Sequence, residues 1–185
     1  MQTIETLLKR YSGRVLREPA PDEGALALML ESAVRAPDHG RLRPWAFIVI
    51  EGEGRSRFGE LLAEHARRAR PAATPEALER ERQKAFRAPM IIVVAARTQP
   101  QARIPIIEQI LSAGAAAQSI LLAAFALGFN AVWKTGDAAY DESTKAALGL
   151  QAKDAIVGFL YVGTEESDLP PPTRPEVQEL VRRWG

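Results

Sequence analysis

The stretch QILSAGAAAQSILLAAFALGFNAVW, residues 109–133, carries no charged side chain. It is long enough to cross a bilayer as a helix, but it is mostly alanine and lacks the dense Leu, Ile, Val and Phe of a lipid-facing segment. Small and polar residues also interrupt it: Ser112, Gly114, Gln118, Ser119, Gly128 and Asn130. We therefore predict a helix over about 105–127, ended by Gly128 and buried on all sides in a domain core or a dimer interface.

Apolar runs on either side of this helix predict four strands. AFIVIEG (46–52) and MIIVVAA (90–96) precede it, while NAVWKTG (130–136) and AIVGFLYVG (155–163) follow it. The runs are continuous rather than alternating, which is typical of strands that are covered on both faces. The sequence therefore predicts a sheet between two layers of helices.

Helical segments fill most of the remaining chain. Good N-cap residues mark the start of three of them, at Asp22, Thr74 and Asp141. The predicted helices cover residues 3–10, 22–36, a segment starting at 56, 75–87 and 141–148. A proline-rich arm with a small terminal helix closes the chain over 168–185. This order predicts an α/β or α+β fold in a single domain, residues 1–185.

Composition excludes several classes of protein. The net charge is +1, and the chain has no cysteine and only two histidines, His39 and His65. Disulfides, thiolate metal sites and a cysteine nucleophile are therefore excluded, and no HExxH, GxSxG or GxxxxGK[ST] motif occurs. The N-terminus lacks the pattern of a signal peptide, and a balanced charge does not attract nucleic acid. We expect a cytoplasmic protein with no metal, no nucleic-acid partner and no membrane attachment.

Basic residues with the geometry to hold an anion gather in two places. The loop in RAPDHGRLRPWAFIVI, residues 35–50, is flanked by Arg35 and His39, while Arg10 and Ser12 end the first helix. A guanidinium group suits phosphate because it donates two parallel, charge-assisted hydrogen bonds. The alternative is that these cations lie at solvated helix ends, where positive charge is favourable in any case.

The ordered pattern resembles the FMN-dependent nitroreductase family. An Arg-x-Ser ends the first helix, a second helix closes in a loop leading to PW.F.VI, and a long Ala-rich helix follows. The motifs RAPDH, PW.F.VIEGEGR, F.RAP, SAG and IVGFLY.G occur in the order typical of its short, YdjA-like NAD(P)H nitroreductases. The resemblance covers nearly the whole chain.

The resemblance implies an α+β sandwich, with a mainly antiparallel central sheet covered by helices and a long buried central helix. It implies a homodimer with one FMN at each end of the interface and a C-terminal arm, residues 168–185, that crosses to the partner subunit. The implied activity takes hydride from NADH or NADPH and reduces a small acceptor, such as a nitroaromatic or a quinone, by a ping-pong mechanism.

The resemblance also assigns residues to the cofactors. Arg10, Tyr11 and Ser12 would bind the FMN phosphate and ribityl chain, and Arg35 and His39 would reach the same FMN from the other chain. Further residues assigned to the flavin ring are Trp133, Lys134 and Thr135, with the backbone of Thr135 or Gly136 near N5. The segment assigned to nicotinamide is Ala123, Ala124, Phe125, Ala126, Leu127 and Gly128, although these residues themselves are typical of a buried helix. The chemistry would lie on FMN, with no catalytic side chain.

Some positions depart from the family pattern, and other functions remain open. Tyr11 and Lys134 stand where the subgroup tends to have arginine, and Arg43 replaces a common glutamine. One alternative is a flavin-binding protein with little turnover, acting as a sensor or carrier. Another is a binder of nucleic acid or acidic protein through the arginine-rich segment 55–87. That segment also carries glutamates, so a solvated face of mixed charge is the better interpretation.

Overall fold

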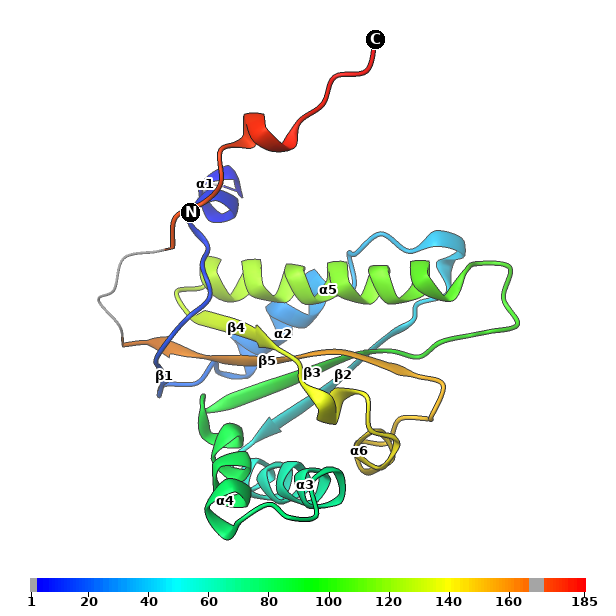
Figure 1. The fold of residues 1–185 in the computed structure, drawn as a ribbon. Coiled ribbons are helices and arrows are strands. Elements are labelled where there is room, and N and C mark those ends of the chain that lie inside the picture. Colours follow the sequence, from blue (N-terminus) through cyan, green and yellow to red (C-terminus); the bar gives the residue numbers. More distant parts are fainter. Residues whose placement is uncertain (1–2, 167–171) are drawn as a thin grey trace.

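A five-stranded sheet separates two layers of helices in the computed structural model, which describes residues 3–166 and 172–185 (Figure 1). The strands are β1 (Leu16–Arg17), β2 (Trp45–Glu51), β3 (Met90–Ala96), β4 (Asn130–Lys134) and β5 (Ala155–Glu165). All pairings are antiparallel, in the order β1-β5-β3-β2, and β4 also pairs with β5. The four predicted strands are confirmed and the fold is α+β. The two-residue β1 was missed because it is too short to leave a pattern.

Helices cover both faces of the sheet. One face carries α2 (Glu23–Ala33) and α5 (Ile106–Ala126), with α1 (Thr3–Lys9) packed against α5 (Figure 1). The other face carries α3 (Glu53–Ala69), α4 (Pro75–Gln83) and α6 (Glu142–Ala147). The predicted helix 75–87 is divided, because a 3-10 turn, η2 (Lys84–Phe86), follows α4.

The predicted N-caps are confirmed by their hydrogen bonds. The Asp22 carboxylate accepts from the backbone N–H of Ala25 at 2.8 Å, and the Thr74 hydroxyl accepts from that of Ala77 at 3.3 Å. Asp141 accepts from the N–H of Thr144 at 2.8 Å. Each cap satisfies a backbone donor that the first helical turn leaves without a partner, which fixes where α2, α4 and α6 begin.

Strand β3 forms the centre of the core, and all of its residues are buried. Its alternate side chains enter two clusters. Met90, Ile92 and Val94 pack with α2 and α5, while Ile91 and Val93 pack with α3 on the other face. A continuous apolar run is required for this arrangement because both sides of the strand face helices.

Within this chain the helix α5 is buried on one side only, so it is not enclosed by one domain core, and burial of its outer side in a dimer interface stays a prediction. Ala113, Ala117 and Ile120 on the sheet side are fully buried, whereas Ile107 and Leu111 on the outer side are 59% and 63% exposed. Alanines let the helix approach the sheet closely, and the larger apolar residues are left outside. By length and composition alone α5 could cross a membrane, and 44% of its apolar window is buried inside the protein.

The C-terminal arm leaves the body of the molecule near α1 (Figure 1). Of the predicted arm, 168–171 lie outside the described residues. Residues 172–185 are exposed, and the predicted small helix is a 3-10 turn, η4 (Val177–Leu180). Within one chain, nothing in the described residues covers the apolar side chains of this segment: Val177, Leu180, Val181 and Trp184.

Candidate functional site

The segment between α1 and β1 is fixed along the edge of β4. Ser12 forms a parallel bridge with Ala131, and the N–H of Gly13 donates to the carbonyl of Ala131 at 3.1 Å. The Glu165 carboxylate accepts from the N–H groups of Arg14 and Val15 at 2.9 and 3.2 Å. A Cβ at position 13 would lie 2.6 Å from a Glu165 oxygen, so glycine is needed for this close approach.

This arrangement forms a cavity of about 660 Å³ beside β1 and β4, which we call the edge cavity. Ser12, Val132 and Lys134 line it together with three arginines: Arg14, Arg17 and Arg87. Arg17 is paired with Glu166 at 3.3 Å. Among the described residues, Arg14, Arg87 and Lys134 have no carboxylate partner, so the cavity carries uncompensated positive charge.

Arg10 lies next to a second arginine that the sequence did not single out. Arg174 of the C-terminal arm donates from Nη2 to the carbonyl of Arg10 at 3.2 Å. Burial lowers the pKa of the Arg10 guanidinium, and the positive charge of Arg174 lowers it further. No carboxylate of the described residues is paired with either group. A bound anion would offset the repulsion between these two guanidinium groups.

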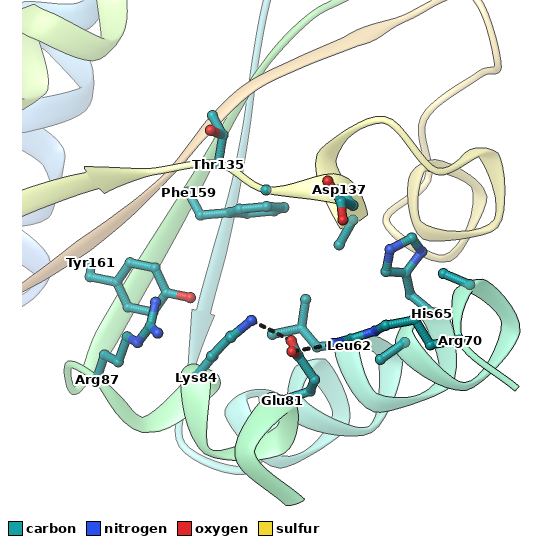
Figure 2. A pocket seen from close by; sticks show the side chains of 14 residues that line it. Leu62, His65, Arg70, Glu81, Lys84, Arg87, Thr135, Asp137, Phe159 and Tyr161 are labelled. Atoms are coloured by element: carbon teal, nitrogen blue, oxygen red, sulfur yellow. Dashed lines mark hydrogen bonds and ion pairs between the residues drawn. The ribbon is translucent and has the colours of Figure 1, made fainter. Parts of the chain in front are cut away.

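A second cavity, of about 440 Å³, opens where β4 runs into a turn, and we call it the turn cavity (Figure 2). Thr135 and Gly136 form one wall, and Phe159 and Tyr161 of β5 form another. Gly136 has φ +123°, and a Cβ added to it would meet no atom within 4 Å. The backbone at Gly136 is therefore open to a ligand in this cavity. Arg87 lines both cavities, which places them side by side.

Charged groups from α3, α4 and η2 line the opposite side of the turn cavity (Figure 2). Glu81 bridges Arg70, at 3.0 Å, and Lys84. Burial opposes the ionisation of Glu81, but the hydrogen bonds from Lys84 and Arg70 outweigh it, so the pKa of this carboxyl lies below its usual value. Burial raises the pKa of the Tyr161 hydroxyl to about 12, against a smaller opposing effect of Arg87. The cavity thus holds a fixed carboxylate, fixed cations and a neutral phenol.

Three of the six residues predicted to bind FMN from the first chain line these cavities, and the described lining residues do not include Arg10, Tyr11 or Trp133. Ser12 and Lys134 line the edge cavity and Thr135 lines the turn cavity. The Tyr11 ring stands edge-on to Phe125 at 6.1 Å between centroids. Trp133 faces the other side of the sheet, where its Nε1 donates to the carbonyl of Val157 at 3.1 Å, so only its backbone borders the site.

The residues predicted to act from the partner chain lie elsewhere. Arg35 lines a groove of about 380 Å³ between α1, α2 and α5, together with Ala123 and Ala126 of the predicted nicotinamide segment. His39 is paired with Glu108 of α5, at 2.6 Å between Nδ1 and Oε2. The described residues that line the edge and turn cavities include neither Arg35 nor His39, nor any of 123–128. Their roles remain predictions.

Several site residues were missed from the sequence. Arg14 follows Ser12 by two positions, and Arg87 lies within the F.RAP motif, so both carried a local signal. No local signal in the sequence singled out Lys84, Tyr161 or Arg174. A charged helix end, an apolar strand and a terminal arm meet at this site only through tertiary packing.

Comparison with known proteins gives a consistent result. The profile described as "Nitroreductase family" matches residues 7–164. The chain is 40% identical over 166 residues to NAD(P)H nitroreductase YdjA of Escherichia coli K12, and the match covers 90% of each chain. It is 37% identical over 165 residues to an NAD(P)H nitroreductase of Haemophilus influenzae, and that match covers 89% of each chain. Both names give the activity as a provisional assignment.

Solved structures share the fold. A nitroreductase-like family protein from Bacillus cereus is 25% identical, with a TM-score of 0.81 over 100% of this chain and 96% of that one. A protein from Desulfovibrio desulfuricans, crystallised in complex with FMN and provisionally named a nitroreductase, is 24% identical, with a TM-score of 0.75 over 100% and 98%. At this identity the second match supports the fold alone.

Proposed function

Because the chain belongs to the nitroreductase family, we propose that it is an FMN-dependent oxidoreductase that takes hydride from NADH or NADPH and reduces a small acceptor such as a nitroaromatic or a quinone. One observation supports this proposal above the others. A cation-lined cavity beside Ser12 and Lys134 adjoins a second cavity at the open backbone of Gly136. The two cavities offer one place for an anionic tail and another for a flat ring.

The donor set fits FMN. The phosphate of FMN is close to a dianion at neutral pH, and the Arg10–Arg174 pair with the Ser12 hydroxyl supplies charge-assisted donors for it. The ribityl chain would follow the edge cavity. The ring would lie near Thr135 and Gly136, within reach of the cations that border the turn cavity. Arg174 takes part here in place of the second arginine expected at position 11.

FMN, when bound, supplies hydride transfer, and the protein supplies position and electrostatics. The amide of Gly136 would donate to the ring edge, and the absence of a Cβ allows that approach. Lys84, Arg87 and Arg14 favour the negative charge that builds up on reduction. Nicotinamide and acceptor would use the same open face in turn. Initial-rate plots should therefore give parallel lines, and intersecting lines would contradict this order.

The outer side of α5 and the C-terminal arm support a homodimer. Leu111, Trp184 and the other exposed apolar side chains need a partner surface. A second copy would bring its own Arg35 and His39 toward the FMN, and the arm would cross to that copy. Light scattering at micromolar concentration should give the mass of a dimer.

Reconstitution tests the proposed function. The purified chain is mixed with FMN or FAD and desalted, and the bound flavin is quantified. We expect one FMN per chain, retained in preference to FAD, and loss of the yellow colour on adding NADH or NADPH without oxygen. A folded protein that retains no FMN would refute the proposal. Retained FMN that neither nucleotide bleaches would indicate a flavin carrier or sensor instead.

A further inference from the structure

We propose that His65 donates the proton that the acceptor needs when it is reduced in the turn cavity. This inference rests on the proposed function. Reduction of a quinone adds two electrons and two protons, and reduction of a nitro group to a nitroso group and water needs the same number. The hydride carries both electrons but only one proton. The second proton must come from another donor beside the bound acceptor.

His65 is the group in the turn cavity suited to this task. Imidazole exchanges a proton between pH 5 and 8, whereas guanidinium groups do not release theirs. Among the described lining residues, Glu81 is held ionised with a lowered pKa, and Tyr161 has a pKa of about 12. The pKa of Glu81 is shifted away from neutrality on the acid side, and that of Tyr161 lies far above it. Neither group therefore gives up and regains a proton readily at neutral pH.

A fixed carboxylate orients the His65 ring. Its Nδ1 lies 3.5 Å from Oδ1 of Asp141, and the side chains are only 15% and 21% exposed. Asp141 is itself held by the N–H and hydroxyl of Thr144, at 2.8 and 2.9 Å, and by Arg68 at 2.9 Å. Burial opposes its ionisation, but the Thr144 hydrogen bonds and the charges of Arg68 and His65 outweigh that effect, so the pKa of Asp141 is lowered.

This geometry sets the roles of the two ring nitrogens. Nδ1 is the ring nitrogen that lies beside the Asp141 carboxylate, as in other histidine–carboxylate pairs, which leaves Nε2 for a ligand. No hydrogen bond of the described residues engages Nε2, and Figure 2 shows the ring on the α3 side of the turn cavity, facing the turn that carries Asp137. Other charged groups around His65 in this cavity are Asp137, Arg70 and Glu81.

The proposed step is balanced. The acceptor receives a hydride from FMN that NAD(P)H has reduced, and its oxygen takes a proton from Nε2 of the His65 imidazolium. A carbonyl oxygen becomes a hydroxyl, or a nitro oxygen leaves as water. His65 becomes neutral and regains its proton from solvent at the cavity mouth.

The test compares His65→Gln with Glu64→Gln in the FMN-loaded protein. Glu64 is the exposed neighbour of His65 on α3 and does not line the turn cavity. Stopped flow separates bleaching by NAD(P)H from reoxidation by a quinone. We expect His65→Gln to bleach at the normal rate and to reoxidise on the order of 100-fold more slowly. His65→Gln should also change the pH dependence of reoxidation, because it removes the proposed proton donor.

A second readout does not depend on activity. The chain has two histidines, so the imidazole signal that His65→Gln removes from the proton NMR spectrum belongs to His65. Asp141→Asn keeps a good N-cap for α6 but removes the carboxylate beside Nδ1, and it should change the chemical shift of that signal. The variant should also slow reoxidation, by less than His65→Gln.

Each outcome decides a different claim. Normal reoxidation with unchanged pH dependence in His65→Gln would overturn the role of His65 while leaving the proposed function intact. An unchanged His65 signal in Asp141→Asn would remove Asp141 from the pair. Absence of bleaching in the unaltered protein and in Glu64→Gln would refute the proposed function, and this inference with it.

Discussion

The two faces of the sheet are built from opposite chemistry. On the α5 face, uncharged side chains pack against the sheet and larger apolar ones remain exposed on the outside of the helix. On the face of α3, α4 and α6, ion pairs such as Arg70–Glu81 and Arg68–Asp141 border the turn cavity or its histidine. An apolar face can bind a second copy of itself, whereas a charged and hollow face can hold a ligand. In the proposed function, the α5 face mediates assembly and the turn cavity on the other face holds the ring, while a second copy would complete the FMN site with its Arg35 and His39.

The largest expected effect is at the outer side of α5. Leu111→Glu places a carboxylate where we expect the dimer interface, and an unpaired charge buried there costs roughly 3–5 kcal/mol per subunit. The variant should be monomeric by light scattering and should lose FMN, while its circular dichroism remains normal. Arg80→Gln, on the exposed part of α4, makes the same change in net charge and should stay dimeric. A dimeric Leu111→Glu would show that the α5 face does not mediate assembly.

The inner side of α5 should respond as an ordinary core. Ile120 is fully buried against the sheet, so Ile120→Ala should lower the free energy of unfolding by about 2–5 kcal/mol in a urea titration. Ile107→Ala, on the exposed side of the same helix, is the control, because it removes the same atoms from an exposed side chain. Both variants are compared at the same protein concentration. Equal losses at both positions would contradict the division of α5 into a core side and an open side.

At the end of α1, Arg10 should matter for the ligand rather than for the fold. Arg10→Ala should weaken FMN binding by about 1.5–3 kcal/mol, the usual worth of a hydrogen bond to a charged group. Fluorescence titration with FMN measures this loss, and riboflavin, which lacks the phosphate, should bind the variant and the unaltered protein alike. A similar loss for riboflavin would place Arg10 away from the phosphate.

The Glu81 bridge should add a small, pH-dependent contribution to stability. The pKa of this carboxyl is lowered in the folded state from its ordinary 4.5, so its contribution is present above that value and is lost as the pH falls through the lowered one. Glu81→Gln should cost about 1 kcal/mol at neutral pH and nothing in strong acid. Glu142→Gln is the control, and a loss for Glu81→Gln that is the same at every pH would exclude an ionic origin.

Strands and caps could be predicted because their signals are local. The apolar run of β3 and the side chains of Asp22, Thr74 and Asp141 act within a few residues of their own positions. The division of the chain into helices, strands and a terminal arm followed from such signals.

The rest depends on contacts that join distant parts of the chain. β1 pairs with residues near 165, and Arg174 reaches Arg10 across nearly the whole sequence. The turn cavity combines α3, α4 and β5, so neither Lys84 nor His65 could be assigned to it from spacing. The exposure of the outer side of α5 could not be predicted either. The sequence of an uncharged helix does not tell whether its second side packs against the same chain or against another one.

The rate of flavin reduction in Gly136→Val tests most directly whether the charged face carries the chemistry. Gly149→Val is the matched control, since both glycines have positive φ and open space at the Cβ position, but Gly149 lies away from the turn cavity. Both substitutions strain the backbone, and Gly136→Val does so more, because φ +123° and ψ 176° lie in a region that essentially only glycine adopts. In stopped flow with NAD(P)H under anaerobic conditions, we expect FMN to remain bound in both and its reduction to slow at least 10-fold, about 1.4 kcal/mol, in Gly136→Val alone. Equal rates in the two variants would contradict the placement of the reacting ring at this turn.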